Sequence, residues 1–227
     1  MRLTPRDVQL VKDIGLSYVM SRDQIVSLGY FSSVTRANTR MRALRALGLL
    51  RRIETPFFAQ SLFVAGPRSV DIVGERIASI LAGRTSSPRF IQHALCVNNV
   101  RLALLEKGAT AWRFEQQLSS SFRFAGREYQ VRPDGLTVSD AGLVAVEVDL
   151  GHVAPSKFRE KLLGFDAFAA SGECARHWHA PTFKVLTVTT GKLRAKRLIC
   201  CVPQDSRFTF ECLTFDQLSV PFIGHWS

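Results

Sequence analysis

The sequence predicts a mixed α/β fold (α+β) in two domains, and three features of its pattern carry this prediction. Residues 1–66 show helix-spaced apolar positions followed by two short strand-like runs. A small polar run over residues 83–88 then interrupts the pattern. Strand-like and helix-like runs alternate after it. We therefore expect a first domain over 1–66, a linker helix over 67–87 and a second domain over 88–227.

The first helix is expected to begin at Thr4-Pro5, because a threonine cap, a proline in the first turn and Asp7 three residues on resemble a capping box. Ser21 with Gln24 opens a second short helix in the same way. Ser32 or Ser33 caps a third helix that ends near Gly48. Two strands over residues 49–53 and 61–64, joined by a loop containing Pro56, follow as a hairpin.

The third helix and the first strand of the hairpin are basic. The chain carries 30 Lys and Arg against 19 Asp and Glu, a net charge of +11, which favours a polyanionic partner such as nucleic acid. Helix, helix, basic helix and hairpin is the order of a winged helix-turn-helix, whose third helix enters the major groove of double-stranded DNA. A solvated helix face usually mixes charge signs, and this helix carries no acidic residue. The expected DNA-binding residues are Arg36, Asn38, Thr39, Arg40, Arg42, Arg45, Arg51 and Arg52.

The second domain shows the order α-β-β-β-α-β followed by further elements. The run over residues 142–149 is mostly apolar, so we expect it to be central in the sheet. The expected elements are a helix over 90–105, strands over 111–115, 126–132 and 142–149, a helix over 156–168, a strand over 182–188, a basic helix over 192–197 and a strand over 208–212.

Three carboxylates stand at the ends of two of these strands. Asp134 follows the strand over 126–132, and Glu147 and Asp149 end the next strand. Carboxylates that meet at one sheet edge favour a hard divalent cation, so we expect Asp134, Glu147 and Asp149 to bind Mg²⁺ or Mn²⁺. The alternative is a structural role. Asp134 could be a turn residue, because Pro-Asp-Gly is an ordinary turn sequence, and Glu147 and Asp149 could be charged residues at a strand end.

This pattern resembles the PD-(D/E)XK nuclease motif, in which Pro-Asp is followed by acid-x-Lys. The resemblance implies a restriction-endonuclease-like second domain with Asp134, Glu147, Asp149 and Lys161 as catalytic residues. Asp149 stands where that motif has its lysine. Some branches carry the lysine on the following helix, which makes Lys161 the better candidate and leaves Lys157 open.

A wider resemblance, to the replication-relaxation family with its MobC-type plasmid mobilization relaxases, covers most of the chain. It implies a metal-dependent endonuclease that nicks a plasmid transfer or replication origin, with further mobilization or replication proteins as partners. The residues that carry it are Leu3-Thr4-Pro5-Arg6-Asp7, His93, residues 98–102, Trp112, Pro133-Asp134, residues 147–151 and residues 161–165.

Other readings stay open at this point. The chain could be a non-catalytic DNA-binding regulator or replication accessory with an inactive nuclease-like domain. His177-Trp178-His179 matches the histidine pattern of tyrosine relaxases, and with Cys174 it could suggest zinc, although we expect a loop there. Glu115 could join the metal ligands, and His93 could be functional.

Apolar runs, the first residues and the cysteines together predict the cellular compartment. No apolar run approaches the ~20 residues that a membrane span needs, and the first residues lack a signal-peptide pattern, so we expect a cytoplasmic protein. Five cysteines without framework spacing argue against a secreted disulfide scaffold.

Overall fold

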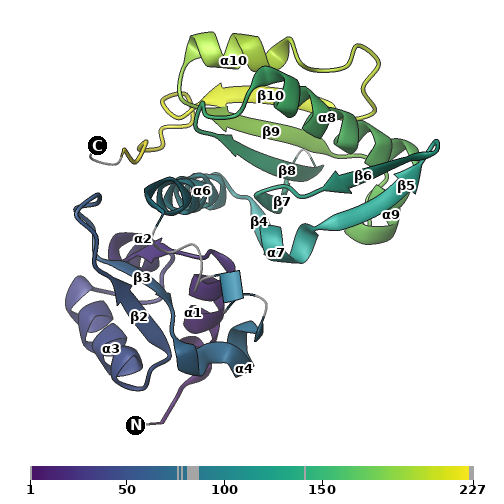
Figure 1. Ribbon diagram of the computed structural model, residues 1–227. Coiled ribbons are helices and arrows are strands. Elements are labelled where there is room, and N and C mark those ends of the chain that lie inside the picture. The colour runs from purple at the N-terminus through teal and green to yellow at the C-terminus, as the bar shows by residue number, and fades with distance from the viewer. Residues whose placement is uncertain (1, 76, 78, 81–86, 141, 225–227) are drawn as a thin grey trace. The chain divides into compact units, whose positions relative to one another are not determined.

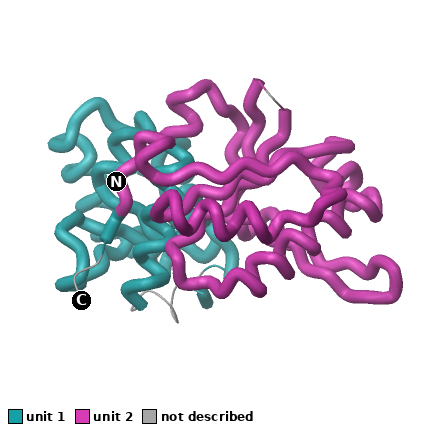
Figure 2. Tube along the Cα trace, turned by 90° about the horizontal axis from the view of Figure 1, so that it is seen from above, with its two compact units in different colours: residues 1–102, 223–227 teal, residues 103–222 magenta. Residues whose placement is uncertain are grey.

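The computed structural model describes residues 2–75, 77, 79–80, 87–140 and 142–224 (Figure 1). The chain forms two compact units, residues 1–102 with 223–227 and residues 103–222 (Figure 2). The fold is mixed α/β, as expected. None of the described helices is long and apolar enough to cross a bilayer.

The first unit begins with three helices and a small antiparallel sheet. Its elements are α1 (Pro5–Leu16), β1 (Met20–Ser21), α2 (Arg22–Ser27), α3 (Val34–Ala46), β2 (Leu50–Ile53) and β3 (Leu62–Ala65), and the strand order is β1-β3-β2. The predicted hairpin is therefore confirmed.

Side-chain caps define where these helices begin. Both expected capping boxes form, Thr4 with Asp7 at α1 and Ser21 with Gln24 at α2. The Ser33 hydroxyl caps α3, which settles the choice between the two serines. Each cap satisfies backbone N–H groups that the first turn of a helix leaves without intrahelical acceptors.

The linker segment differs from the predicted continuous helix. A 3-10 turn (Pro67–Ser69) leads into α4 (Val70–Val73), which ends at Gly74 with φ +87°. A positive φ suits glycine, because a side chain there would clash with the backbone. Much of the rest of the predicted linker helix, and most of the polar run at 83–88, lies outside the described residues.

Helix α6 (Pro88–Glu106) packs into the first unit for most of its length. The Asn98 side chain donates to the Val19 carbonyl at 2.9 Å, and an Arg101 Nη atom lies 2.9 Å from Asp13 Oδ2. The compact units consequently divide at residues 102 and 103, whereas the sequence pattern suggested residues 87 and 88.

The second unit is built on a mixed five-stranded sheet of order β10-β9-β8-β7-β4. Strands β8, β9 and β10 are parallel, β7 and β4 are antiparallel to their neighbours, and β8 is central, as predicted. The bounds are β4 (Thr110–Phe114), β7 (Gly135–Ser139), β8 (Gly142–Asp149), β9 (Lys184–Thr189) and β10 (Thr209–Thr214).

This unit also contains helices α8 (Pro155–Ala170), α9 (Glu173–Trp178) and α10 (Lys192–Ile199) (Figure 1). Its core is rich in aromatic side chains. Phe165 and Phe168 of α8 are fully buried, and Trp178 and Phe183 pack against them. Ala145 of β8 belongs to the same core, so the odd-numbered residues of β8 face α8.

The predicted core strand over 126–132 is placed elsewhere. Strand β6 (Arg127–Val131) pairs with β5 (Ser120–Phe124) in a separate two-stranded ribbon, which follows α7 (Glu115–Leu118) (Figure 1). The strand beside β8 is β7, which begins directly after Pro133-Asp134 and which the sequence pattern did not predict. Its five residues carry too short a pattern to separate a strand from a turn.

Candidate functional site

Asp134 lies where the antiparallel pair β7 and β8 brings the start of one strand beside the end of the other. Its backbone N–H donates to the Val146 carbonyl at 3.0 Å. Its carboxylate accepts a hydrogen bond from the Val148 N–H at 2.7 Å. The side chain is thus held against the end of β8, on the stretch of strand that carries Glu147.

Gly135, at the start of β7, lets the backbone lie close against the Trp112 ring. A Cβ atom at residue 135 would lie 2.2 Å from the Trp112 ring of β4. No larger residue fits without displacing that ring, because real Cβ atoms do not approach heavy atoms so closely. The Asp-Gly pair therefore belongs to a packed strand start, although its sequence resembles a turn.

Glu147 points toward α8, on the face it shares with Ala145. Its side chain is only 5% exposed, and Lys161 Nζ donates to its Oε2 atom. A buried carboxylate needs such a partner, since burial of an isolated charge is costly. Of the two candidate lysines, Lys161 is the one that contacts Glu147, whereas Lys157 pairs with Glu160 at 2.9 Å.

The charges around Lys161 keep it protonated. Burial acts to lower the pKa of Lys161, but the negative charges of Glu147, Asp134 and Glu115 outweigh it and raise this pKa above its ordinary value. Glu115 also pairs with Arg132, at 2.7 Å. Lys161 is therefore a fixed cation near three carboxylates and not a base at neutral pH.

Asp149 has a different set of partners. Arg194 of α10 holds both carboxylate oxygens at 2.8 Å, and the Thr189 hydroxyl donates to Oδ2 at 2.8 Å. A third bond from Arg194, to the Val153 carbonyl at 2.6 Å, ties the loop after β8 to the same guanidinium. Sequence reasoning missed Arg194 as a partner, because it lies within a basic helix that reads as solvent-exposed.

Asp134 and Glu147 carry the oxygen ligands that a divalent ion would need. In the described ranges, no three His, Cys, Asp or Glu side chains are arranged as a metal-ligand cluster. Mg²⁺ does not require one, because it retains several waters and commonly binds one or two carboxylates with a substrate phosphate. Asp134 and Glu147 are the two carboxylates here that could act as such a pair, whereas Asp149 is engaged by Arg194.

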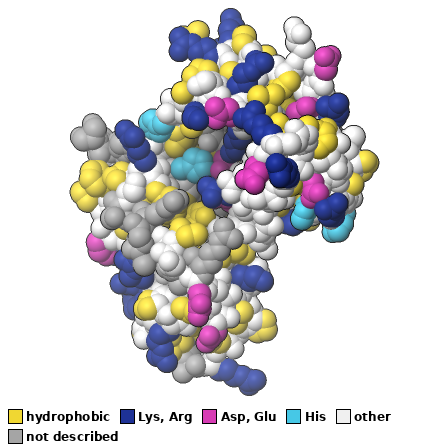
Figure 3. Space-filling view, turned by 45° about the vertical axis from the view of Figure 1, so that its right-hand side comes forward, with side chains coloured by type: hydrophobic (Ala, Val, Ile, Leu, Met, Phe, Trp, Pro, Cys, Tyr) yellow, Lys and Arg dark blue, Asp and Glu magenta, His cyan; other side chains and the backbone are white. Residues whose placement is uncertain are grey.

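The basic residues of the first unit lie mostly on its surface. All the predicted DNA-binding residues are exposed except Arg40, whose Nε donates to Asp7 Oδ1 at 2.7 Å. Figure 3 shows dark blue Lys and Arg side chains at many places on the face in view, with fewer Asp and Glu. Arg40 thus helps to hold α3 against α1 through its ion pair with Asp7.

Four of the exposed arginines surround one hollow of about 460 Å³. Arg42 and Arg45 come from α3, and Arg51 and Arg52 come from β2. Within this group Arg52 has a carboxylate neighbour, Glu54, at 3.4 Å. A concentration of guanidinium groups of this kind suits phosphate oxygens.

The histidine pattern at 177–179 lies on and after α9, so the loop that we expected there is wrong. His177 Nε2 lies 2.9 Å from Glu173, and Cys174 Sγ contacts the Pro181 carbonyl. His93 is half-buried on α6. The described residues show no metal-ligand cluster here either.

Comparisons with known proteins agree with the sequence resemblance. A search of curated proteins found no match. Among solved structures, protein VC1899 from Vibrio cholerae is 12% identical, with 96% of this chain and 55% of that one covered, at a TM-score of 0.34. The chain thus spans about half the length of VC1899, and the TM-score is too low to assign a fold. The replication-relaxation family matches residues 12–182, well over half of the chain. The chain therefore belongs to the replication-relaxation family, which implies a DNA-related role.

Proposed function

We propose that this protein is a metal-dependent DNA endonuclease that binds duplex DNA at a plasmid transfer or replication origin and nicks one strand. The single observation that carries the proposal is the convergence of Asp134, Glu147 and Lys161 at the paired ends of β7 and β8. Membership of the replication-relaxation family supplies the DNA-related context.

The order of elements supports two roles along the chain. Helices α1, α2 and α3 followed by the β2–β3 hairpin have the order of a winged helix-turn-helix, with α3 as its recognition helix. When α7, the β5–β6 ribbon and α9 are set aside as insertions, elements α6, β4, β7, β8, α8 and β9 follow the α-β-β-β-α-β order of restriction-endonuclease-like proteins.

The chemistry assigns a role to each charged group. Asp134 and Glu147 would hold Mg²⁺ or Mn²⁺, which when bound activates water and offsets charge on the phosphate. Asp134 is oriented by the Val148 N–H, and Glu147 by Lys161. Lys161, as a fixed cation, stabilises negative charge on the phosphoryl oxygens.

Nicking of a supercoiled plasmid that carries the cognate origin tests the proposal. Wild type with Mg²⁺ or Mn²⁺ should form open circles. Asp134→Asn and Glu147→Gln should lose roughly 100-fold or more of this rate, because several kcal/mol of charge stabilisation are removed. The control Glu160→Gln changes an exposed carboxylate on α8 and should nick like wild type.

A second candidate function is DNA binding without cleavage. Asp149 stands where the related motif has its lysine, and Arg194 engages both of its oxygens. Tight binding to origin DNA with no nick under any divalent cation, and unchanged behaviour of both carboxylate variants, would establish this second function instead.

A further inference from the structure

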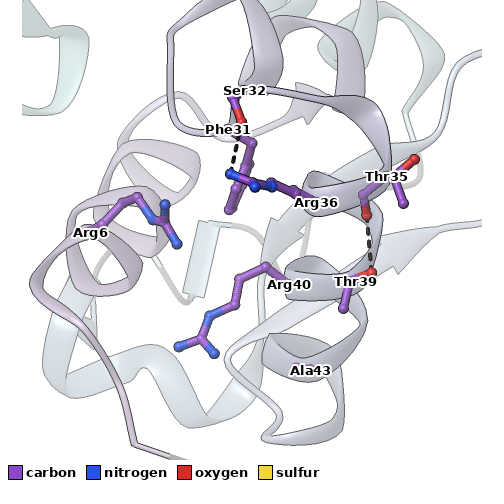
Figure 4. Close-up of a pocket in the computed structure, with 8 residues that line it drawn as sticks. All are labelled: Arg6, Phe31, Ser32, Thr35, Arg36, Thr39, Arg40 and Ala43. Atoms are coloured by element: carbon purple, nitrogen blue, oxygen red, sulfur yellow. Dashed lines mark hydrogen bonds between the residues drawn. The ribbon is translucent and has the colours of Figure 1, made fainter.

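A second basic hollow lies in the first unit, between α1 and α3. It measures about 490 Å³, and Figure 4 shows Arg6 from α1 and Arg36 and Arg40 from α3 directed toward it. Arg6 was not among the residues that the sequence assigned to DNA binding. We call this space the Arg6 hollow.

Aromatic and hydroxyl contacts orient two of its arginines. The Arg6 guanidinium lies over the ring of Phe31, with its Cζ atom 5.0 Å from the ring centroid. Arg36 Nη1 donates to the Ser32 hydroxyl at 3.2 Å (Figure 4). Both guanidinium groups are therefore held at the hollow before any ligand arrives, which lowers the entropy lost on binding.

The three arginines differ in how far their charge is balanced. Arg40 is paired with Asp7, and that carboxylate has no exposed surface. In the part of the chain that the structure describes, neither Arg6 nor Arg36 is ion-paired with a carboxylate. The Arg6 hollow thus presents about two uncompensated positive charges.

The Arg6 hollow and the hollow around Arg42 lie on different sides of α3. Thr35, Thr39 and Ala43, at helical spacing, line the Arg6 hollow. Arg42 and Arg45 line the other one, with β2. A helix that lies in the major groove runs between two phosphate backbones, so basic groups on both of its sides can reach a phosphate.

We propose that the Arg6 hollow binds one backbone phosphate of the duplex, with Arg6 and Arg36 as its donors. This inference rests on the proposed DNA binding of the first unit and adds a contact from α1. Guanidinium groups with hydroxyls beside them suit a phosphodiester. A contact of this kind sets the register of the protein on the duplex and reads no base.

Salt-dependent binding of the full chain to duplex DNA tests this assignment. Replacing Arg6 and Arg36 together by alanine removes both donors and should reduce the slope of log K against log salt by about 0.9, the contribution of one phosphate. Arg6→Ala alone should reduce the slope by part of this amount and weaken binding. The affinity for origin DNA and for an unrelated duplex should fall by the same factor. The matched control is Lys12→Ala, because Lys12 is an exposed cation on α1 that does not line the hollow, and its slope should equal that of wild type.

Three outcomes would overturn the assignment. An unchanged slope and affinity for Arg6→Ala, while Arg42→Ala and Arg45→Ala weaken binding, would refute the Arg6 hollow and leave DNA binding intact. A selective loss for origin DNA would show that Arg6 reads a base. Failure of wild type to bind any duplex would refute both this inference and the proposed function. Thermal unfolding checks that each variant is folded.

Discussion

Lys161 of α8 donates a hydrogen bond to Glu147 of β8, and this ion pair fastens the helix to the buried end of the central strand. The Glu147 side chain is 5% exposed and the Lys161 side chain 35% exposed. The ion pair therefore stabilises the fold, in addition to the electrostatic role proposed for Lys161.

Replacing Lys161 by methionine should lower both stability and nicking. The change leaves the Glu147 carboxylate buried without this cation, which costs 3–5 kcal/mol for a fully buried pair. Because Lys161 is partly exposed, we expect roughly 2 kcal/mol in the free energy of unfolding, measured in urea. A variant as stable as wild type would contradict the pairing.

The raised pKa of Lys161 also sets how the difference in unfolding free energy between wild type and Lys161→Met depends on pH. A group with a raised pKa in the folded state stabilises it fully below the pKa of the unfolded chain, ordinarily 10.5. The stability difference between wild type and Lys161→Met should therefore be constant through neutral pH and shrink only as the pH rises above about 10.5. A difference that disappears near pH 8 would show that the lysine is not held as a cation.

The contribution of Asp7 to the stability of the first unit should be lost in acid. The Arg40 hydrogen bond, with bonds from Thr4, outweighs burial and holds the pKa of Asp7 well below its usual range. Replacing Asp7 by asparagine should cost about 3 kcal/mol at pH 7, through the buried pair and the cap. Since a lowered pKa stabilises the fold only above the unfolded value, this cost should shrink as the pH falls below about 4. Urea titrations of both proteins at pH 7 and pH 3 measure it.

Arg194 and Asp149 should be coupled in stability rather than in metal binding. Arg194→Met removes the guanidinium that holds both carboxylate oxygens and should cost about 3 kcal/mol. In a double-mutant cycle with Asp149→Asn, the two losses should be strongly non-additive. Additive losses, with Mn²⁺ binding abolished by Asp149→Asn alone, would instead make Asp149 a metal ligand.

Gly135→Ala should disturb the start of β7. The added methyl would lie 2.2 Å from the Trp112 ring, so the ring must move. We expect a loss of roughly 2 kcal/mol, as for an overpacked core site, and a change in tryptophan fluorescence. Gly126→Ala offers a comparison, because its Cβ meets nothing within 4 Å, although its φ of +79° adds some strain there too.

Local chemistry carried much of the fold prediction. The capping pairs Thr4–Asp7 and Ser21–Gln24 involve residues three apart, so their spacing alone identified two helix starts. The apolar run of β8 likewise predicted a central strand. The predictions that failed concern which strands pair: the run at 126–132 reads as a strand, but nothing in its pattern says that it pairs with the adjacent β5 and lies outside the sheet of β8.

The same limit applies to the candidate site. The sequence places Asp134 and Glu147 at strand ends, and the β7–β8 register brings those ends together. Asp149 has the same local pattern as Glu147, yet its charge is balanced by Arg194, forty-five residues further along. A one-dimensional pattern could not distinguish the two carboxylates, because their difference arises from which helix packs over each one.

Mn²⁺ binding to the full chain, followed by titration calorimetry, tests most directly whether Asp134 and Glu147 hold the ion. Wild type and Glu160→Gln should bind alike, whereas Asp134→Asn and Glu147→Gln should each weaken binding by at least about 10-fold, since each removes one of two charged ligands. Equal affinity of all four proteins for Mn²⁺ would contradict the account.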